Sequence, residues 1–209
     1  MSELNLDQLT TQYFDVLKEL GNIGAGNATT ALAQMLGTKV DMSVPHVQLV
    51  EFKDVGDLMG GAEQVMAGIY LSVEGDVTGS IMFLAGQRAA RQLVDMLMGG
   101  QMKDPTEPFN DVELSALKEV GNIITGSYLN SLSMMTNLKM VPSIPFVAID
   151  MAGAILSVPA IEFGIMGDKM LLIENQFFDT DKLSGYFILL PDMDGYTRIL
   201  TSLGMQLPG

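Results

Sequence analysis

Apolar residues recur at helical spacing over two long stretches of the chain. From residue 7 to residue 36 they return every three or four positions, and the same spacing runs through 111–136. This period predicts two amphipathic helices that each bury one face. Asp7 stands at the start of the first stretch and is predicted to cap that helix. Shorter helices are predicted over 87–98 (before Gly99-Gly100), from about Asp150 to Pro159, and over 193–203.

Strict alternation of apolar and polar residues predicts strands elsewhere. Residues 65–74 and 77–84 alternate on either side of Gly75-Asp76, which is typical of a hairpin. Residues 40–52 are rich in residues that favour strands, and Pro45 limits that segment to a sheet edge or an irregular strand. Further strands are predicted over 144–149, 170–178 and 184–190.

These patterns indicate an α+β fold. The hairpins imply antiparallel pairing, and the amphipathic helices need an apolar surface on which to pack. We therefore expect an antiparallel sheet that is covered by helices.

The chain contains two copies of one unit. Between 17–47 and 117–147, thirteen of the 31 aligned positions are identical, and the strings at 78–84 and 184–190 are also similar. A polar segment with two prolines, 101–110, separates the copies. We expect one domain over 1–209 made of two repeats, about 1–100 and 101–209, with internal pseudo-twofold symmetry.

Composition excludes several classes of function. The net charge is −14, with only 11 Lys and Arg residues, which argues against nucleic acid and anionic membranes as partners. No apolar run is long enough for a membrane span, so we expect no membrane insertion and a cytoplasmic location. With no cysteine and one histidine, thiolate chemistry and His-rich metal sites are excluded. A monomer is expected, because the duplication already supplies the symmetry of a dimer.

A polar stripe recurs on both long helices. Asp15, Glu19 and Asn22 fall within roughly 60° of each other around the helix axis, so they share one face. The second copy places Ser115, Glu119 and Asn122 at the same spacing. A Glu beside a lysine on a helix surface is otherwise an ordinary solvated position, but here the Glu and the Asn recur together.

Three glycines interrupt the first helical pattern. Gly21, Gly24 and Gly26 each weaken a helix by roughly 1 kcal/mol relative to alanine. Close packing is the expected use of Gly21 and Gly26, which recur in the second copy, and close approach of another backbone is the alternative. Gly24 is replaced by Ile124 in the second copy, so a glycine is not essential at that position of the second copy.

The spacing D/S-x3-E-x2-N-x22-P resembles the signature of the CheC/CheX/FliY phosphatase family. It occurs twice, and the string GNIGAGNATTAL at 21–32 also resembles the first signature helix of this family. The matching positions are Asp15, Glu19, Asn22 and Pro45 in the first copy, and Ser115, Glu119, Asn122 and Pro145 in the second.

The resemblance implies hydrolysis of the aspartyl phosphate on the chemotaxis response regulator CheY. Asn22 and Asn122 would orient the attacking water, and Glu19 and Glu119 would engage a lysine at the regulator's phosphorylation site. No cofactor of the chain's own is implied, because the regulator would carry the Mg²⁺. Supporting roles are implied for Asp15, Ser115, Pro45 and Pro145.

A second partner is implied by the segment 147–156. It resembles a helix with which members of the family bind the receptor deamidase CheD, which makes Asp150 a candidate contact. A helix that only covers the sheet is the alternative reading. For the whole chain, the alternative to an enzyme is a non-catalytic adaptor that binds CheY or CheD. The presence of both Glu/Asn pairs favours the enzyme.

Overall fold

The computed structural model describes most of the chain. Asp7 and Pro45 lie outside the described residues, so the predicted cap and the first motif proline are not placed. The residues described are 11–43, 46–51, 54–58, 61–99, 104, 106–164, 169–179 and 183–206.

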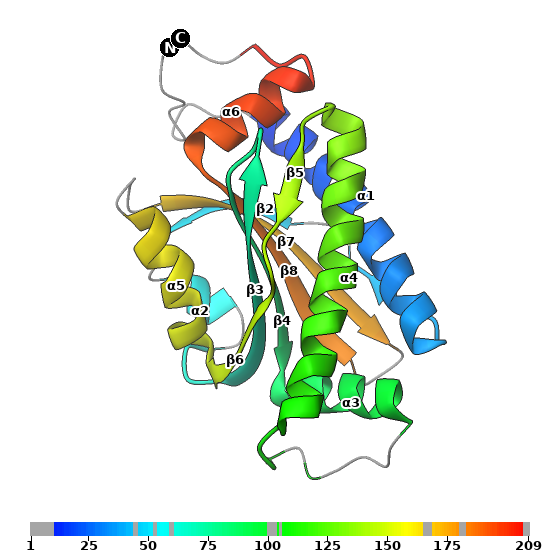
Figure 1. Cartoon of the computed structure of the whole chain (residues 1–209). Coiled ribbons are helices and arrows are strands. Elements are labelled where there is room, and N and C mark those ends of the chain that lie inside the picture. Colours follow the sequence, from blue (N-terminus) through cyan, green and yellow to red (C-terminus); the bar gives the residue numbers. More distant parts are fainter. Residues whose placement is uncertain are drawn as a thin grey trace.

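One antiparallel sheet joins the two halves of the chain (Figure 1). Its strands, over the part of the chain that the structure describes, are β1 (Asp41–Met42), β2 (His46–Glu51), β3 (Val65–Gly75), β4 (Gly79–Gly86), β5 (Met140–Pro142), β6 (Phe146–Met151), β7 (Lys169–Asp179) and β8 (Leu183–Pro191). The order along the sheet is β1-β7-β8-β4-β3-β5, with β2 also paired to β7 and β6 also paired to β3. Every pairing is antiparallel. The α+β prediction is confirmed.

Each half of the chain supplies the edge of the other. β1 and β2 come from the first repeat but pair with β7 of the second, and β5 and β6 pair with β3 of the first. β4 and β8 lie side by side at the centre, where Ile81 is opposite Leu189. If each strand is exchanged for its counterpart in the other repeat (β1 for β5, β3 for β7 and β4 for β8), the strand order is the same from either edge of the sheet. This order is what a pseudo-twofold relation would give, and the symmetry itself stays a prediction.

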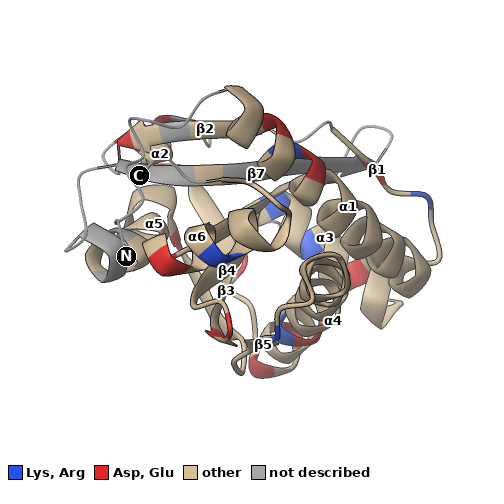
Figure 2. Ribbon diagram, turned by 90° about the horizontal axis from the view of Figure 1, so that it is seen from above, with Lys and Arg blue, Asp and Glu red and all other residues tan. Residues whose placement is uncertain are grey.

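The two long helices pack together on one face of the sheet, in opposite directions (Figures 1 and 2). They are α1 (Thr11–Leu36) and α4 (Asp111–Thr136), and α3 (Gln87–Met98) and α6 (Met193–Ser202) join the same layer. Leu17, Leu20 and Val120 are fully buried against the sheet. Burying this apolar stripe stabilises the helices more than their intrinsic propensity does.

A second, smaller core covers the opposite face of the sheet. There α2 (Val55–Leu58) and α5 (Ala152–Gly164) lie over β3, β4 and β8. Ile155 and Leu156 of α5 pack with Met82 and Ile188. α2 was not predicted, because four residues are too few to show a helical period.

Two predictions about the segment 147–159 are wrong. Asp150 and Met151 belong to β6, where Asp150 is opposite Met66, and the helix begins only at Ala152. The helix also does not end at Pro159, which lies inside α5. A proline removes one hydrogen bond from a helix interior, and burial of Ile155 and Leu156 in the second core offsets that loss.

The remaining element predictions are confirmed within a few residues. The first hairpin joins β3 to β4, and Gly75 and Gly79 adopt positive φ angles of 117° and 153° in its turn. Gly99 ends α3 in the left-handed conformation, with its N–H donating to the carbonyl of Asp95. Among the described residues, no helix combines the length and the apolar character needed to cross a lipid bilayer.

Candidate functional site

The predicted Glu/Asn stripes lie on the outer surface of α1 and α4. On α1, Asp15 and Glu19 are exposed and Asn22 is half-buried. On α4, Ser115, Glu119 and Asn122 are all exposed. Leu17 and Leu20, which are fully buried, lie about half a turn away around the axis of α1 from the stripe. The stripes therefore face away from the sheet.

The four candidate catalytic side chains are not engaged inside the protein. Within the part of the chain that the structure describes, no hydrogen bond or ion pair involves the side chains of Glu19, Asn22, Glu119 or Asn122. An ionised carboxylate can only accept hydrogen bonds, whereas an amide can donate and accept. These groups are thus available to a ligand or partner.

The two stripes lie toward opposite ends of the helix pair. Glu19 and Asn22 belong to the first half of α1, and Glu119 and Asn122 to the first half of α4. Because the two helices run in opposite directions, these two halves point to different ends of the molecule (Figure 1). The surface thus presents two separate sites rather than one composite site.

Contacts between α1 and α4 and with the sheet fix the direction in which each stripe points. A Cβ atom on Gly24 would come within 2.8 Å of the ring of Tyr128 in α4, and one on Gly121 would collide with Ile69 of β3. Gly24 is therefore held by packing in the first copy, whereas the second copy buries Ile124 at the matching position. The prediction of close packing is wrong for Gly26, where an added Cβ would meet nothing within 4 Å.

Of the two motif prolines, Pro145 is described, and it lies at the sheet and not on a helix. Pro145 is half-buried in the break between β5 and β6, nine residues beyond the end of α4. This break is tied to β3, since the N–H of Ser143 donates to the carbonyl of Ser72 at 2.8 Å and its hydroxyl accepts from the N–H of Ser72 at 3.0 Å. Pro145 therefore lies where the chain returns to the sheet.

Asp150 is exposed near the end of β6, the strand that leads directly into α5. Its Oδ1 accepts a hydrogen bond of 2.8 Å from the N–H of Met151. Asp150 is thus on β6, whereas the Glu/Asn stripes are on α1 and α4.

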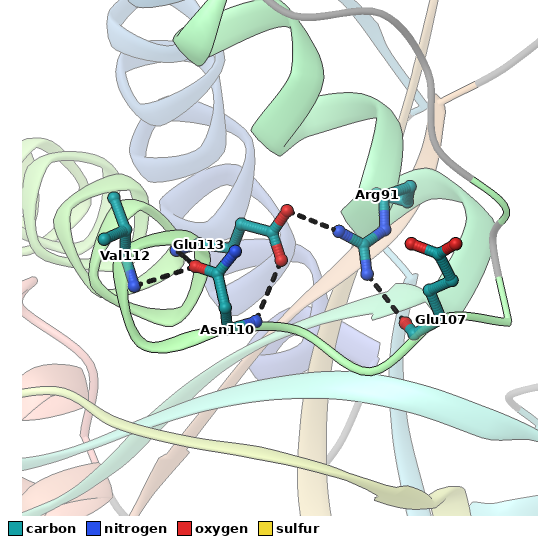
Figure 3. A network of polar contacts seen from close by, with 5 residues as sticks. All are labelled: Arg91, Glu107, Asn110, Val112 and Glu113. Carbon is teal, nitrogen blue, oxygen red and sulfur yellow. Dashed lines mark hydrogen bonds and ion pairs between the residues drawn. The ribbon is translucent and has the colours of Figure 1, made fainter.

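A buried ion pair at the start of α4 was missed by the sequence analysis (Figure 3). Nη1 of Arg91, in α3, lies 2.9 Å from Oε1 of Glu113, and both side chains are buried. Nη2 of Arg91 donates to the carbonyl of Glu107 at 2.7 Å, and the guanidinium lies 3.9 Å from the centre of the Phe109 ring. The pair joins α3, the inter-repeat segment and α4.

The same carboxylate completes the cap of α4. Oδ1 of Asn110 accepts from the N–H groups of Val112 and Glu113 at 3.0 Å, and Oε2 of Glu113 accepts from the N–H of Asn110 at 2.9 Å. This is a capping box. The Asn-x-x-Glu spacing of this box can be recognised in the sequence, but the pairing of Glu113 with Arg91 cannot be predicted from it.

Burial changes the acidity of two tyrosines, Tyr128 of α4 and Tyr196 of α6. It raises the pKa of Tyr128, and it raises the pKa of Tyr196 with an added contribution from the neighbouring Tyr128. Both phenols are therefore neutral at any ordinary pH. They belong to the core and not to the exposed stripes.

Among the described residues, no three His, Cys, Asp or Glu side chains lie together so that they could hold a metal ion. Acidic positions are present on both α1 and α4, while Lys and Arg positions are scattered over the fold (Figure 2).

Comparison with known proteins places these features in a family. The model of the CheC-like family matches residues 15–49 and 112–149, the two segments that hold the motifs. The chain is 38% identical to "CheY-P phosphatase CheC" of Bacillus subtilis (strain 168) over 200 residues, 94% of this chain and 96% of that protein.

Two solved structures share the fold. FliY of Thermotoga maritima has a TM-score of 0.74 and 22% identity, covering 94% of this chain and 98% of its own. The FliM middle domain from H. pylori has a TM-score of 0.67 and 14% identity, covering 93% of this chain and 99% of its own. Both structures share the fold of this chain at low sequence identity, so they support the fold alone. Because the similarity to the Bacillus protein spans nearly all of both chains and the family model matches both motif segments, the chain belongs to the CheC-like family.

Proposed function

We propose that the chain hydrolyses the aspartyl phosphate of a CheY-type response regulator at two sites, Glu19/Asn22 and Glu119/Asn122. The observation that carries the proposal is the pair of solvent-facing Glu/Asn stripes on α1 and α4, whose Glu and Asn side chains make no hydrogen bond or ion pair with the described residues. The name of the Bacillus relative, a CheY-P phosphatase, supports the choice of substrate.

The residue types suit this reaction. An acyl phosphate is already activated, so catalysis can rest on positioning and electrostatics without a covalent nucleophile. Water attacks phosphorus, the bond to the aspartyl oxygen breaks, and the regulator's carboxylate and inorganic phosphate are released. The Asn amide accepts a hydrogen bond from this water and so directs its lone pair at phosphorus.

The carboxylates act on the partner in this proposal. Glu19 and Glu119 pair with a lysine beside the phosphorylated aspartate, which aligns the regulator with the Asn of the same stripe. The magnesium ion is carried by the regulator. Asp15 and Ser115 lie one turn before Glu19 and Glu119 on the same exposed helix face, so a regulator bound at the Glu would also cover these positions.

The test is decay of phosphorylated regulator, measured with the parent protein, Asn22→Ala, Asn122→Ala and the double variant. Each single variant should keep the activity of the other site. The double variant should lose on the order of 100-fold, the scale for removing one positioned hydrogen-bonding group. Binding of the phosphorylated regulator is measured alongside.

Two results would contradict the proposal in different ways. Equal decay with the double variant and the parent would exclude the Asn residues as catalytic groups. Tight binding of the regulator without faster decay by the parent would leave the adaptor as the function of the chain.

Contact with CheD through Asp150 is a separate proposal. Asp150 is exposed and lies on β6 at the edge of the sheet, whereas both stripes lie on helices, so one chain could hold the regulator and the deamidase together. Asp150→Lys should weaken deamidase binding and leave phosphatase activity unchanged. Unchanged deamidase binding would remove Asp150 from that contact.

A further inference from the structure

Four of the glycines within α1 and α4 fall into two groups. Gly24 and Gly121 are needed for packing, because an added Cβ would meet Tyr128 or Ile69. Gly26 and Gly126 are not, because an added Cβ at either one would find nothing within 4 Å. Neither of the latter two has a positive φ angle. The fold of this chain would therefore accept alanine at both positions.

Gly26 and Gly126 lie on the stripes that carry the Glu/Asn pairs. Gly26 follows Asn22 by four residues, as Gly126 follows Asn122, so each glycine is one turn beyond its asparagine on the same face. A helical side chain leans toward the N-terminus and covers the turn before its own Cα. A side chain at position 26 would thus lie over the approach to the amide of Asn22.

Both glycines weaken their helices, and neither is needed to make room for another side chain of the protein. Glycine in a helix interior is less stable than alanine, and these two stand near the middle of 26-residue helices. A helix surface with open space where a Cβ would stand is suited to the close approach of another molecule. The same arrangement is present at both sites.

We propose that Gly26 and Gly126 are clearance positions, which let the phosphoryl-bearing loop of the regulator come close enough for Asn22 or Asn122 to reach its water. The inference rests on the proposed phosphatase function and adds one residue to each site. These glycines do not touch the reacting atoms; they position the partner by leaving room for it.

The test treats each site alone. Gly26→Ala and Gly26→Leu are made in the Asn122→Ala background, and Gly126→Ala and Gly126→Leu in the Asn22→Ala background. Asn27→Leu in the Asn122→Ala background is the matched control, since Asn27 is exposed, adjoins Gly26 and faces about 100° away. kcat/KM for dephosphorylation and the thermal midpoint of unfolding are measured for every variant.

We expect kcat/KM to fall with side-chain size, by about tenfold or more for leucine, because small displacements of reacting groups have large effects on rate. The thermal midpoint of the alanine variants should be unchanged or higher, which damage to the fold would not produce. Asn27→Leu should keep the rate of its background.

Retained kcat/KM in Gly26→Leu and Gly126→Leu would overturn the clearance role while leaving the phosphatase in place. An equal loss in Asn27→Leu would overturn it too, because the effect would then not be confined to the stripe. If the Asn backgrounds themselves show no change in rate, the proposed catalytic sites are wrong, and this result is seen before any glycine variant is compared.

Discussion

At the contact between α1 and α4, the two copies of the repeat use opposite sizes at matching positions. Gly24 leaves room for the ring of Tyr128, and their counterparts are Ile124 and Ala28, both fully buried. The first copy therefore has the smaller residue at both positions, and the second copy has the larger one. The alignment of the repeats shows that Gly24 corresponds to Ile124. The reason is a contact between residues of different repeats, and comparing the two repeats position by position cannot identify that contact.

The Gly24 contact gives a prediction about stability. Gly24→Ala should lower the free energy of unfolding by about 1–3 kcal/mol, because the new methyl group would press on a ring inside a filled core. Urea unfolding measures the change, with Gly26→Ala on the same helix as the matched control. The control should raise stability by about 0.4–1 kcal/mol. Equal changes in both variants would contradict the packing role of Gly24.

Buried Tyr128 and Tyr196 make stability depend on alkaline pH. Their pKa values are raised in the folded state above the value of about 10 for an exposed tyrosine. Above that pH the unfolded chain loses phenol protons that the folded chain keeps, so the free energy of unfolding falls as pH rises. Below it, the contribution of these groups is fully present.

Urea unfolding between pH 8 and about pH 11 tests this dependence. The decline above pH 10 should be shallower in Tyr128→Phe and Tyr196→Phe, which cannot ionise. Equal slopes for the variants and the parent would show that other groups cause the decline.

The Glu/Asn stripe shows what residues alone could predict about the site. Spacing placed Glu19 and Asn22 on one face, and the structure finds that face turned away from the buried Leu17 and Leu20. Whether these residues catalyse is not a matter of spacing, since it depends on a partner that is absent from the sequence. The placement was predictable and the role remains a proposal.

Among the elements, the boundaries of α4 were predicted closely and those of α5 were not. α4 begins beside a polar segment that ends in Asn110, and Glu113 completes its capping box, so local signals define its start. α5 continues through Pro159, a residue that normally ends a helix. Contacts of Ile155 and Leu156 with the far face of the sheet decide its extent, and such contacts leave no local signal.

The ion pair at the start of α4 gives a prediction at the scale of elements. Arg91→Met or Glu113→Gln alone should destabilise the protein by about 3–5 kcal/mol, because each leaves a buried group without its partner. Loss of Glu113 also removes the hydrogen bond to the N–H of Asn110. Urea unfolding of both single variants and the double variant measures the coupling.

The double variant should cost clearly less than the sum of the two single changes, since the residues act as one unit. Additive losses would indicate that Arg91 stabilises the fold through Phe109 and Glu107 alone. Lys118→Met is a control on the exposed face of α4 and should change stability little.

For the whole molecule, the sequence predicted two copies but could not predict how they pair. Similar strands in the two halves could have formed two small sheets or one large one. The structure has one, in which β2 pairs with β7 and β6 with β3. Pairing between halves lets β4 and β8 bury Phe83 against Phe187 at the centre, with ring centroids 5.2 Å apart. This choice depends on the summed burial of both halves and not on any local motif.

Exchange of edge strands predicts that neither repeat folds alone as a monomer. The fragment 1–100 would keep β3 and β4 but lose every partner of β1 and β2, and the fragment 101–209 would lose the partner of β5 and β6. Each would also expose the apolar side of its long helix, half of the contact between α1 and α4. Circular dichroism and amide dispersion in NMR spectra should show little order in either monomeric fragment, and an equimolar mixture should regain the native spectrum. A fragment that unfolds cooperatively as a monomer would contradict this interdependence, whereas one that folds only as a dimer would still agree with it, because a second copy would then supply the missing strands.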